Sequence, residues 1–247
     1  MPNPQRRCAF CGRTGMTKQH VFGDRLLAFL EKKTSSHYVI DTLPDDIRVK
    51  KVDGNIWSKR LRRVCPDCNG GWMRSLEERS FPILSELLLG EAAIPESYCK
   101  TLAARLSQII MVADPSVPDD HWAVHQVDRT TLRLTGEAPS GWLIFLCRAD
   151  VSVESGQYYH ADAFRTQKVV AGQIREILDN NYVSTFLIGK LCVHALTRAP
   201  AGYQGYAGVT LARLWPMAEG GIDLLQSSLL GPTKIVELGA SFRKFHT

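Results

Sequence analysis

Hydrophobic and polar positions follow two different periods along the chain, and together they predict both helices and strands. The clearest helical pattern covers residues 97–113, where apolar side chains recur three or four positions apart. A shorter pattern predicts a helix over residues 24–33. The segment after Cys68 predicts a tight turn and then a helix that breaks near Pro82, because proline cannot donate the helical hydrogen bond.

Strand patterns are concentrated in the second half of the chain. Short runs rich in β-branched and aromatic residues, bounded by turn-forming residues, predict strands over residues 121–127, 131–135, 142–147, 160–164 and 206–214. Residues 183–196 are apolar enough for a buried helix or a strand, and periodicity leaves both open. We therefore predict an α+β protein with a domain at 1–90, a linker at 90–95, and an α+β domain with a mainly antiparallel sheet at 97–247.

Composition places the chain among ordinary globular proteins. Of its 247 residues, 45% are hydrophobic and 22% are charged, which is enough apolar material for a core and excludes a disordered chain. We find no run near the roughly 18 apolar residues of a membrane helix, and the start MPNPQRRCAFCG lacks a signal peptide's apolar run. We expect a cytoplasmic protein without a membrane partner.

The positive charge is unevenly distributed. The whole chain has a net charge of +5, but residues 1–90 hold 16 Lys and Arg against 10 Asp and Glu, whereas residues 91–247 hold 14 against 15. The excess positive charge therefore belongs entirely to the first part. Such a charge favours a polyanionic partner.

Seven cysteines in a cytoplasmic chain indicate thiols or metal ligands, not disulfides. Two Cys-x-x-Cys pairs, each followed by a nearby glycine, have the spacing of zinc knuckles and predict one structural Zn²⁺ held by Cys8, Cys11, Cys65 and Cys68. Such a closed site folds the module and does not catalyse. Reduced buried thiols and a redox pair are the alternatives. The remaining Cys99, Cys147 and Cys192 are expected to be small buried hydrophobes.

The residues around these pairs resemble a nuclease family. KQHVFG at 18–23 follows the first pair, and CNGGWMRSLE begins at the last cysteine of the second. This order over residues 8–90 resembles the HNH, or His-Me finger, endonucleases, in particular a bacterial and phage subgroup with the order CxxC, His-Val-Phe, CxxCNxGWMxxLE. The resemblance implies that the first domain is a zinc-stapled treble clef of the ββα type.

The resemblance also implies roles for individual residues. His20 matches the general base that activates water, and Asn69 matches the asparagine that holds the active-site backbone and the histidine in register. Glu77 or Glu78 falls where the family places a ligand of a catalytic Mg²⁺ or Mn²⁺. Gln19 stands where a metal-holding Asp, Glu or His is common. Gly23 replaces a proline, and we expect this only to loosen a turn.

A basic segment leads to the second cysteine pair. We interpret it as a strip that holds the phosphate backbone of nucleic acid, with double-stranded DNA as the expected partner, although a solvated loop remains the alternative; it comprises Lys50, Lys51, Lys59, Arg60, Arg62 and Arg63. The sequence thus predicts a metal-dependent endonuclease, or else a catalytically inactive zinc protein that binds nucleic acid or a partner. The choice between DNA and RNA, the oligomeric state and the role of residues 97–247 stay open.

Overall fold

The computed structural model describes residues 7–29, 36–43, 46–53, 60–114, 124–151, 157–170, 173–198, 203, 205–217 and 219–241. The helices are α1 (Asp24–Phe29), α2 (Pro66–Cys68), α3 (Arg74–Leu89), α4 (Glu96–Ala113), α5 (Gln126–Thr135) and α6 (Pro232–Gly239), with a π-helical turn at Asn69–Met73 and a 3-10 turn at Leu224–Gln226. No helix in this part of the chain is long and apolar enough to cross a membrane.

The largest sheet is almost wholly antiparallel. Its strands lie in the order β10 (Ala212–Trp215), β6 (Leu143–Ala149), β9 (Leu191–Leu196), β8 (Gln173–Ile188) and β7 (Gln157–Val170), and β12 (Leu229–Leu230) pairs with β6 in parallel. The apolar segment that the sequence left ambiguous forms the end of β8 and all of β9. The predicted α+β class with a mainly antiparallel sheet is confirmed.

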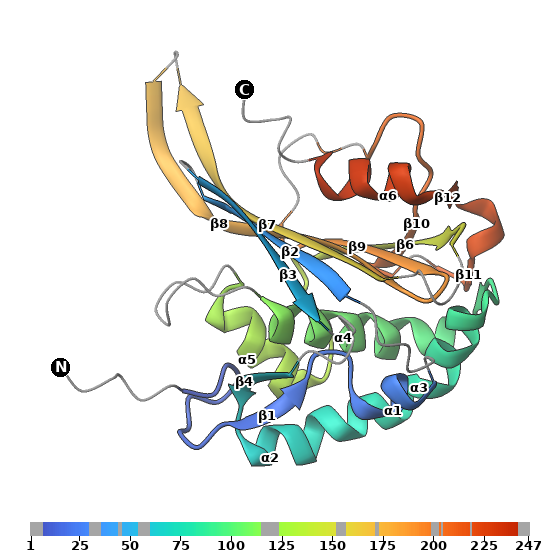
Figure 1. Cartoon of the computed structure of the whole chain (residues 1–247), viewed down its shortest axis with the longest axis horizontal. Coiled ribbons are helices and arrows are strands. Elements are labelled where there is room, and N and C mark those ends of the chain that lie inside the picture. The colour runs from blue at the N-terminus through green and yellow to red at the C-terminus, as the bar shows by residue number, and fades with distance from the viewer. Residues whose placement is uncertain are drawn as a thin grey trace.

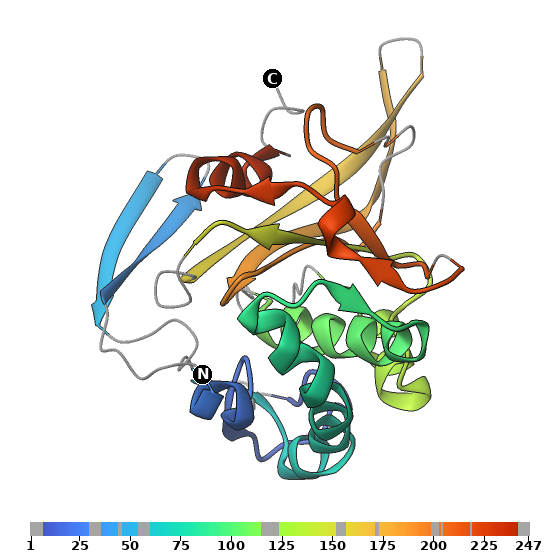
Figure 2. The ribbon, with the colours of Figure 1, turned by 90° about the vertical axis from the view of Figure 1, so that its right-hand side faces the viewer.

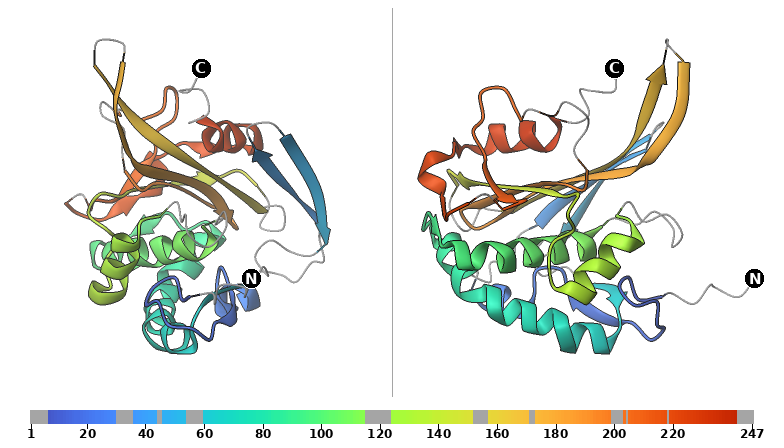
Figure 3. Two further views of the ribbon diagram at one scale, coloured as in Figure 1. Left: turned by 90° about the vertical axis from the view of Figure 1, so that its left-hand side faces the viewer. Right: turned by 180° about the vertical axis from the view of Figure 1, so that it is seen from behind.

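The elements form successive layers. Helix α6 covers one face of the sheet, α4 and α5 cover the other, and the N-terminal elements lie on the far side of α4 (Figure 1; Figure 3, right). The N-terminal layer contains α1, α3 and a two-stranded sheet of β1 (Thr17–His20) and β4 (Arg60–Val64). A second pair, β2 (Ser36–Leu43) and β3 (Asp46–Asp53), stands apart from the large sheet (Figure 2; Figure 3, left).

Helix α4 lies at the centre of this arrangement. The predicted helix is confirmed almost to the residue, but its side chains are buried on every face from Leu102 to Val112 rather than along one stripe. A helix that is covered all round must be sandwiched between two layers. The sheet lies on one side of α4 and the N-terminal layer on the other, and one hydrophobic core joins Phe10, Phe22 and Leu76 to α4 and to Phe186 of β8.

Two sequence predictions are wrong near residue 130. Helix α5 spans Gln126–Thr135 and contains all of the strand predicted over 131–135. Of the strand predicted over 121–127, the structure describes residues 124–127, which lead into α5 and form its first two residues. Alternating Thr and Leu residues favoured a strand locally. The buried pair Arg129 and Leu132, three positions apart, instead faces α4, so tertiary burial selects the helical period.

Two shorter segments also differ from expectation. Helix α3 runs without interruption past Pro82, with buried Ile83, Leu84, Leu87 and Leu88 continuing its contact with α4. It ends at Gly90, whose φ of 105° closes the last turn. In the predicted linker, β5 (Ala93–Ile94) pairs with β11 (Ile222–Asp223). The segment between the two predicted domains is therefore part of the folded body.

Candidate functional site

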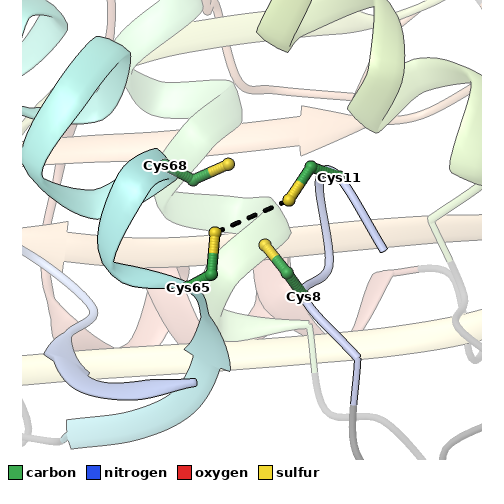
Figure 4. A group of neighbouring side chains, drawn as sticks. All are labelled: Cys8, Cys11, Cys65 and Cys68. Atoms are coloured by element: carbon green, nitrogen blue, oxygen red, sulfur yellow. Dashed lines mark hydrogen bonds between the residues drawn. The ribbon is translucent and has the colours of Figure 1, made fainter. Parts of the chain in front are cut away.

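Four cysteine side chains converge between the first loop and the start of α2. The sulfur atoms of Cys8, Cys11, Cys65 and Cys68 all lie within 4.8 Å of one another, and the Sγ atoms of Cys11 and Cys65 are 3.5 Å apart (Figure 4). Tetrahedral zinc with Zn–S bonds of about 2.3 Å needs sulfurs roughly 3.8 Å apart. The cluster therefore has the size and chemistry of a zinc site, as the spacing predicted.

Local backbone geometry prepares this cluster. The amide of Gly12 donates to the carbonyl of Cys8 at 2.9 Å, and Gly12 adopts a φ of 73° that favours glycine. Ala9 donates to the carbonyl of Arg63 at 2.8 Å, which ties the first knuckle to β4. Pro66 occupies the first turn of α2, where its missing amide hydrogen costs nothing. Each Cys-x-x-Cys pair is thus held by a turn of its own backbone.

The surroundings affect the thiols differently. Burial raises the pKa of Cys8, but backbone hydrogen bonds from Cys65, Phe10 and Cys11 outweigh it and lower the pKa overall. Burial raises the pKa of Cys68, against the effect of the Trp72 indole beside it. Trp72 packs edge-on against Phe10, with ring centroids 5.1 Å apart. The tryptophan therefore belongs to the small core under the cluster, where it supports the cysteines.

A cavity of about 510 Å³ opens beside the cysteine cluster. It brings together residues from β1, α1, β4 and the start of α3, and among them are His20, Asn69, Gln19 and Glu77, which the sequence singled out. The other lining residues are Lys18, Gly23, Asp24, Arg25, Arg60, Gly70 and Arg74. Four of the lining side chains are Lys or Arg and two are carboxylates, so the cavity favours an anionic ligand.

Two neighbouring side chains hold His20 in the cavity. Its imidazole is 12% exposed and lies between Asp24 and Arg60. Arg60 is directly opposite His20 in the β1–β4 pairing and donates from Nε to His20 Nε2 at 2.5 Å. Arginine only donates, so Nε2 must accept, and the remaining hydrogen on Nδ1 points to the Asp24 carboxylate. The contacts thus assign the neutral Nδ1–H tautomer to His20.

Glu77 reaches the same cavity from α3. Its Oε1 accepts the backbone N–H of Arg25 at 3.3 Å, and its Oε2 lies 3.9 Å from Nη2 of Arg105. A side chain on Gly23 would put its Cβ 2.5 Å from Glu77 Oε1, and Gly23 has a φ of 88°. Gly23 is therefore more than the loosened turn that the sequence indicated, because its missing side chain makes room for the Glu77 carboxylate.

The other two expected metal ligands differ from each other. Glu78 accepts from Arg25 and Arg74, each at 3.2 Å, and does not line the cavity. Gln19 lines it, and among the described residues no donor reaches its buried Oε1. A buried carbonyl oxygen without a donor is an open position for a hard cation or a ligand donor. Asn69 also lines the cavity, and its backbone N–H donates to Cys65 at 3.0 Å.

Of the three side chains of the expected basic strip that the structure describes, one lines the cavity. Arg60 contacts His20, whereas Arg62 and Arg63 follow it along β4 without lining the cavity. Lys50 and Lys51 lie in β3, where only the backbone is described, and Lys59 lies outside the described residues. The structure adds cationic residues that the sequence analysis passed over: Lys18, Arg25 and Arg74.

Asp24 and Arg105 were also missed. Asp24 had one local signal, since an acidic residue in the first turn of a predicted helix lies only four positions after His20 in the sequence. Arg105 had none, because it lies 83 positions from the carbonyl that it contacts. No protein-family model, no curated protein and no solved structure matches the chain.

Proposed function

We propose that this protein is a metal-dependent endonuclease of the HNH type that hydrolyses phosphodiester bonds in nucleic acid, with double-stranded DNA as the substrate. The single observation that carries the proposal is the shared cavity of His20, Gln19, Asn69 and Glu77 beside a four-cysteine cluster. These residues come from segments about 50 positions apart, and the fold brings them onto one cavity. The N-terminal layer around the four cysteines would then be a treble clef of the ββα type.

His20 would act as the general base. An imidazole that donates from Nδ1 to Asp24 keeps the lone pair of Nε2 available for a proton from water, and the carboxylate then stabilises the imidazolium that forms. In the free protein Arg60 occupies that lone pair. A phosphodiester offers the guanidinium charged oxygens, which bind it more strongly than a neutral imidazole nitrogen. Substrate binding would therefore move Arg60 to the phosphate and uncover the base.

A divalent cation would complete the site. Gln19 supplies a buried oxygen that no donor of the described residues reaches, and Glu77 supplies a carboxylate on the same cavity, so the donor set fits Mg²⁺ or Mn²⁺. Such an ion, when bound, stabilises charge on the phosphate and on the leaving oxygen. The phosphates on either side of the scissile bond would bind three cationic lining residues, which we call the cavity rim: Lys18, Arg25 and Arg74.

The first test is cleavage of supercoiled plasmid by the purified protein with Mg²⁺ or Mn²⁺. Wild-type protein should nick it, and His20→Ala should lower the rate by about 10²- to 10⁴-fold, the range typical of a lost general base. His125→Ala is the matched control, because His125 precedes α5 and does not line the cavity. If His20→Ala cuts as fast as wild type, or if neither ion supports cleavage, the nuclease proposal is wrong.

The alternative is a binding protein without catalysis. It is favoured by one observation: in the free protein His20 is engaged by Arg60, and Glu77 by Arg25 with Arg105 nearby. A protein of this class would retain labelled duplex DNA in a mobility shift, lose it when Arg60 and Arg74 are replaced by alanine, and leave the DNA intact with either ion. The plasmid test separates the two functions directly.

A further inference from the structure

Arg105 of α4 connects residues 97–247 to the His20 cavity. Arg105 lies in the middle of α4, and its side chain is only 2% exposed. Burial lowers its pKa, and the neighbouring charge of Glu77 raises it. A buried guanidinium is costly unless it is fully paired, and apolar residues often replace a buried ion pair without loss of stability. An arginine at this position therefore calls for an explanation beyond packing.

The contacts of Arg105 converge on the loop that carries the cavity. Nη2 donates to the carbonyl of Phe22 at 2.6 Å and lies 3.9 Å from Glu77 Oε2, while Nη1 donates to Gln108 at 2.9 Å. Phe22 lies in the three-residue connection between His20, the last residue of β1, and Asp24, the first residue of α1. A single guanidinium thus contacts the connection and lies close to the proposed metal ligand.

Glu77 transmits this support to the other side of the loop. Its carboxylate lies against Gly23 and accepts the amide of Arg25, the second residue of α1. The loop after His20 is therefore held between Arg105 and Glu77. Because Asp24 is the partner of His20 Nδ1, a shift of this loop would release the ring.

A second buried arginine shows what a purely structural pair looks like. Arg129 of α5 is fully buried, bonds Asp114 at 2.6 Å, and also donates to the carbonyls of Met111 and Val124. None of these partners lines the cavity. Arg105 differs because, among the described residues, its nearest carboxylate is at 3.9 Å and its Nε has no acceptor. Its contacts favour placement of the loop over charge pairing.

We propose that Arg105 is a positioning residue for the His20 cavity, through which helix α4 fixes the loop between His20 and Asp24 and the Glu77 carboxylate. Residues 97–247 are then a structural half of the site and not an accessory domain. This inference deepens the proposed function, because it assigns how the general base and a metal ligand are held.

The decisive experiment observes His20 without relying on activity. In the full chain labelled with ¹⁵N-histidine, the His20 resonances are identified by their absence in His20→Ala. We expect Arg105→Met to shift them from the fixed Nδ1–H pattern toward averaged tautomers, and Arg105→Lys to restore them in part, since lysine keeps the charge beside Glu77. Arg129→Met is the matched control and should leave the His20 signals unchanged.

Kinetics provide a second readout. Arg105 does not line the cavity, so Arg105→Met should lower kcat about 100-fold through misplacement of the base and change KM less than 3-fold. If Arg105→Met does not fold, Glu77→Gln, which keeps the shape and removes the charge, should shift the same His20 signals. Unchanged His20 signals in folded Arg105→Met, or in both Arg105→Lys and Glu77→Gln, overturn the inference. A wild-type protein that cuts nothing overturns the nuclease proposal alone.

Discussion

The four-cysteine cluster and the His20 cavity lie side by side but are built differently. In the cluster, four ligands of one kind come from two short turns, and together they can fill every position of a tetrahedral ion. In the cavity, residues of many kinds come from β1, α1, β4 and α3. Arg105 of α4 does not line the cavity, but it bonds the carbonyl of Phe22 in the loop after β1. One site is closed and the other is open.

The two sites are therefore sensitive to different substitutions. The cluster depends on its four side chains, and few changes outside them should matter. The cavity depends on a bent loop, on a glycine without a side chain and on an arginine 83 positions away from its partner. Substitutions that never touch a substrate should therefore disable the cavity and spare the cluster.

The largest effect is expected from a cluster ligand. Cys65→Ser should abolish stoichiometric zinc and unfold the N-terminal layer, because the binding free energy of a structural zinc, about 10 to 16 kcal/mol, is folding free energy. Metal analysis and circular dichroism measure both. Cys99→Ala removes another fully buried cysteine and should keep one zinc per chain. Zinc retained in Cys65→Ser, or absent from wild type, would contradict the assignment.

The next effect separates the two sites. Gly23→Ala should cost about 2 to 3 kcal/mol, because the left-handed backbone penalises a Cβ and the new methyl would push the Glu77 carboxylate off the Arg25 amide. Gly136→Ala has a similar φ of 70° with nothing within 4 Å of the new Cβ, so it should cost only about 1 to 2 kcal/mol. Chemical denaturation measures both. Zinc content should stay unchanged, and equal losses in the two variants would argue against the Glu77 contact.

A smaller effect tests whether the cavity is open to a cation. Gln19→Glu adds a formal charge at the buried side-chain oxygen that lines the cavity. It should lower the Mg²⁺ concentration for half-maximal cleavage by about tenfold, equivalent to about 1.4 kcal/mol. A Mg²⁺ titration of plasmid cleavage measures this, with Gln126→Glu, at an exposed position at the start of α5, as the control. A higher Mg²⁺ requirement in Gln19→Glu would place the ion elsewhere.

The smallest effect concerns the rim. Arg74→Ala should weaken duplex DNA binding about threefold and reduce the salt dependence of binding by about one phosphate contact. Arg213→Ala, an exposed arginine on β10 outside the cavity, should change neither quantity. Fluorescence anisotropy at several salt concentrations measures both variants. If Arg74→Ala and Arg213→Ala weaken DNA binding equally, the cavity rim does not bind DNA in preference to the rest of the surface.

Local sequence patterns predict the cysteine cluster and the position of α4. Both signals are local: two thiols two residues apart form one turn, and apolar residues three or four apart form one helix. The same local logic failed at α5, where β-branched residues favoured a strand until burial of Arg129 and Leu132 against α4 chose the helix. The local pattern also predicted a break at Pro82, but α3 continues past this proline because it packs against α4.

The construction of the cavity depends on tertiary contacts. The resemblance selected His20, Gln19, Asn69 and Glu77, but it did not distinguish Glu77 from Glu78, which pack in different surroundings three and four residues beyond Arg74. Arg60 meets His20 because two strands pair in one register, and Arg105 meets Phe22 because α4 is buried between two layers. Such contacts join residues far apart in sequence, so their energies depend on the packed chain and leave no local pattern to read.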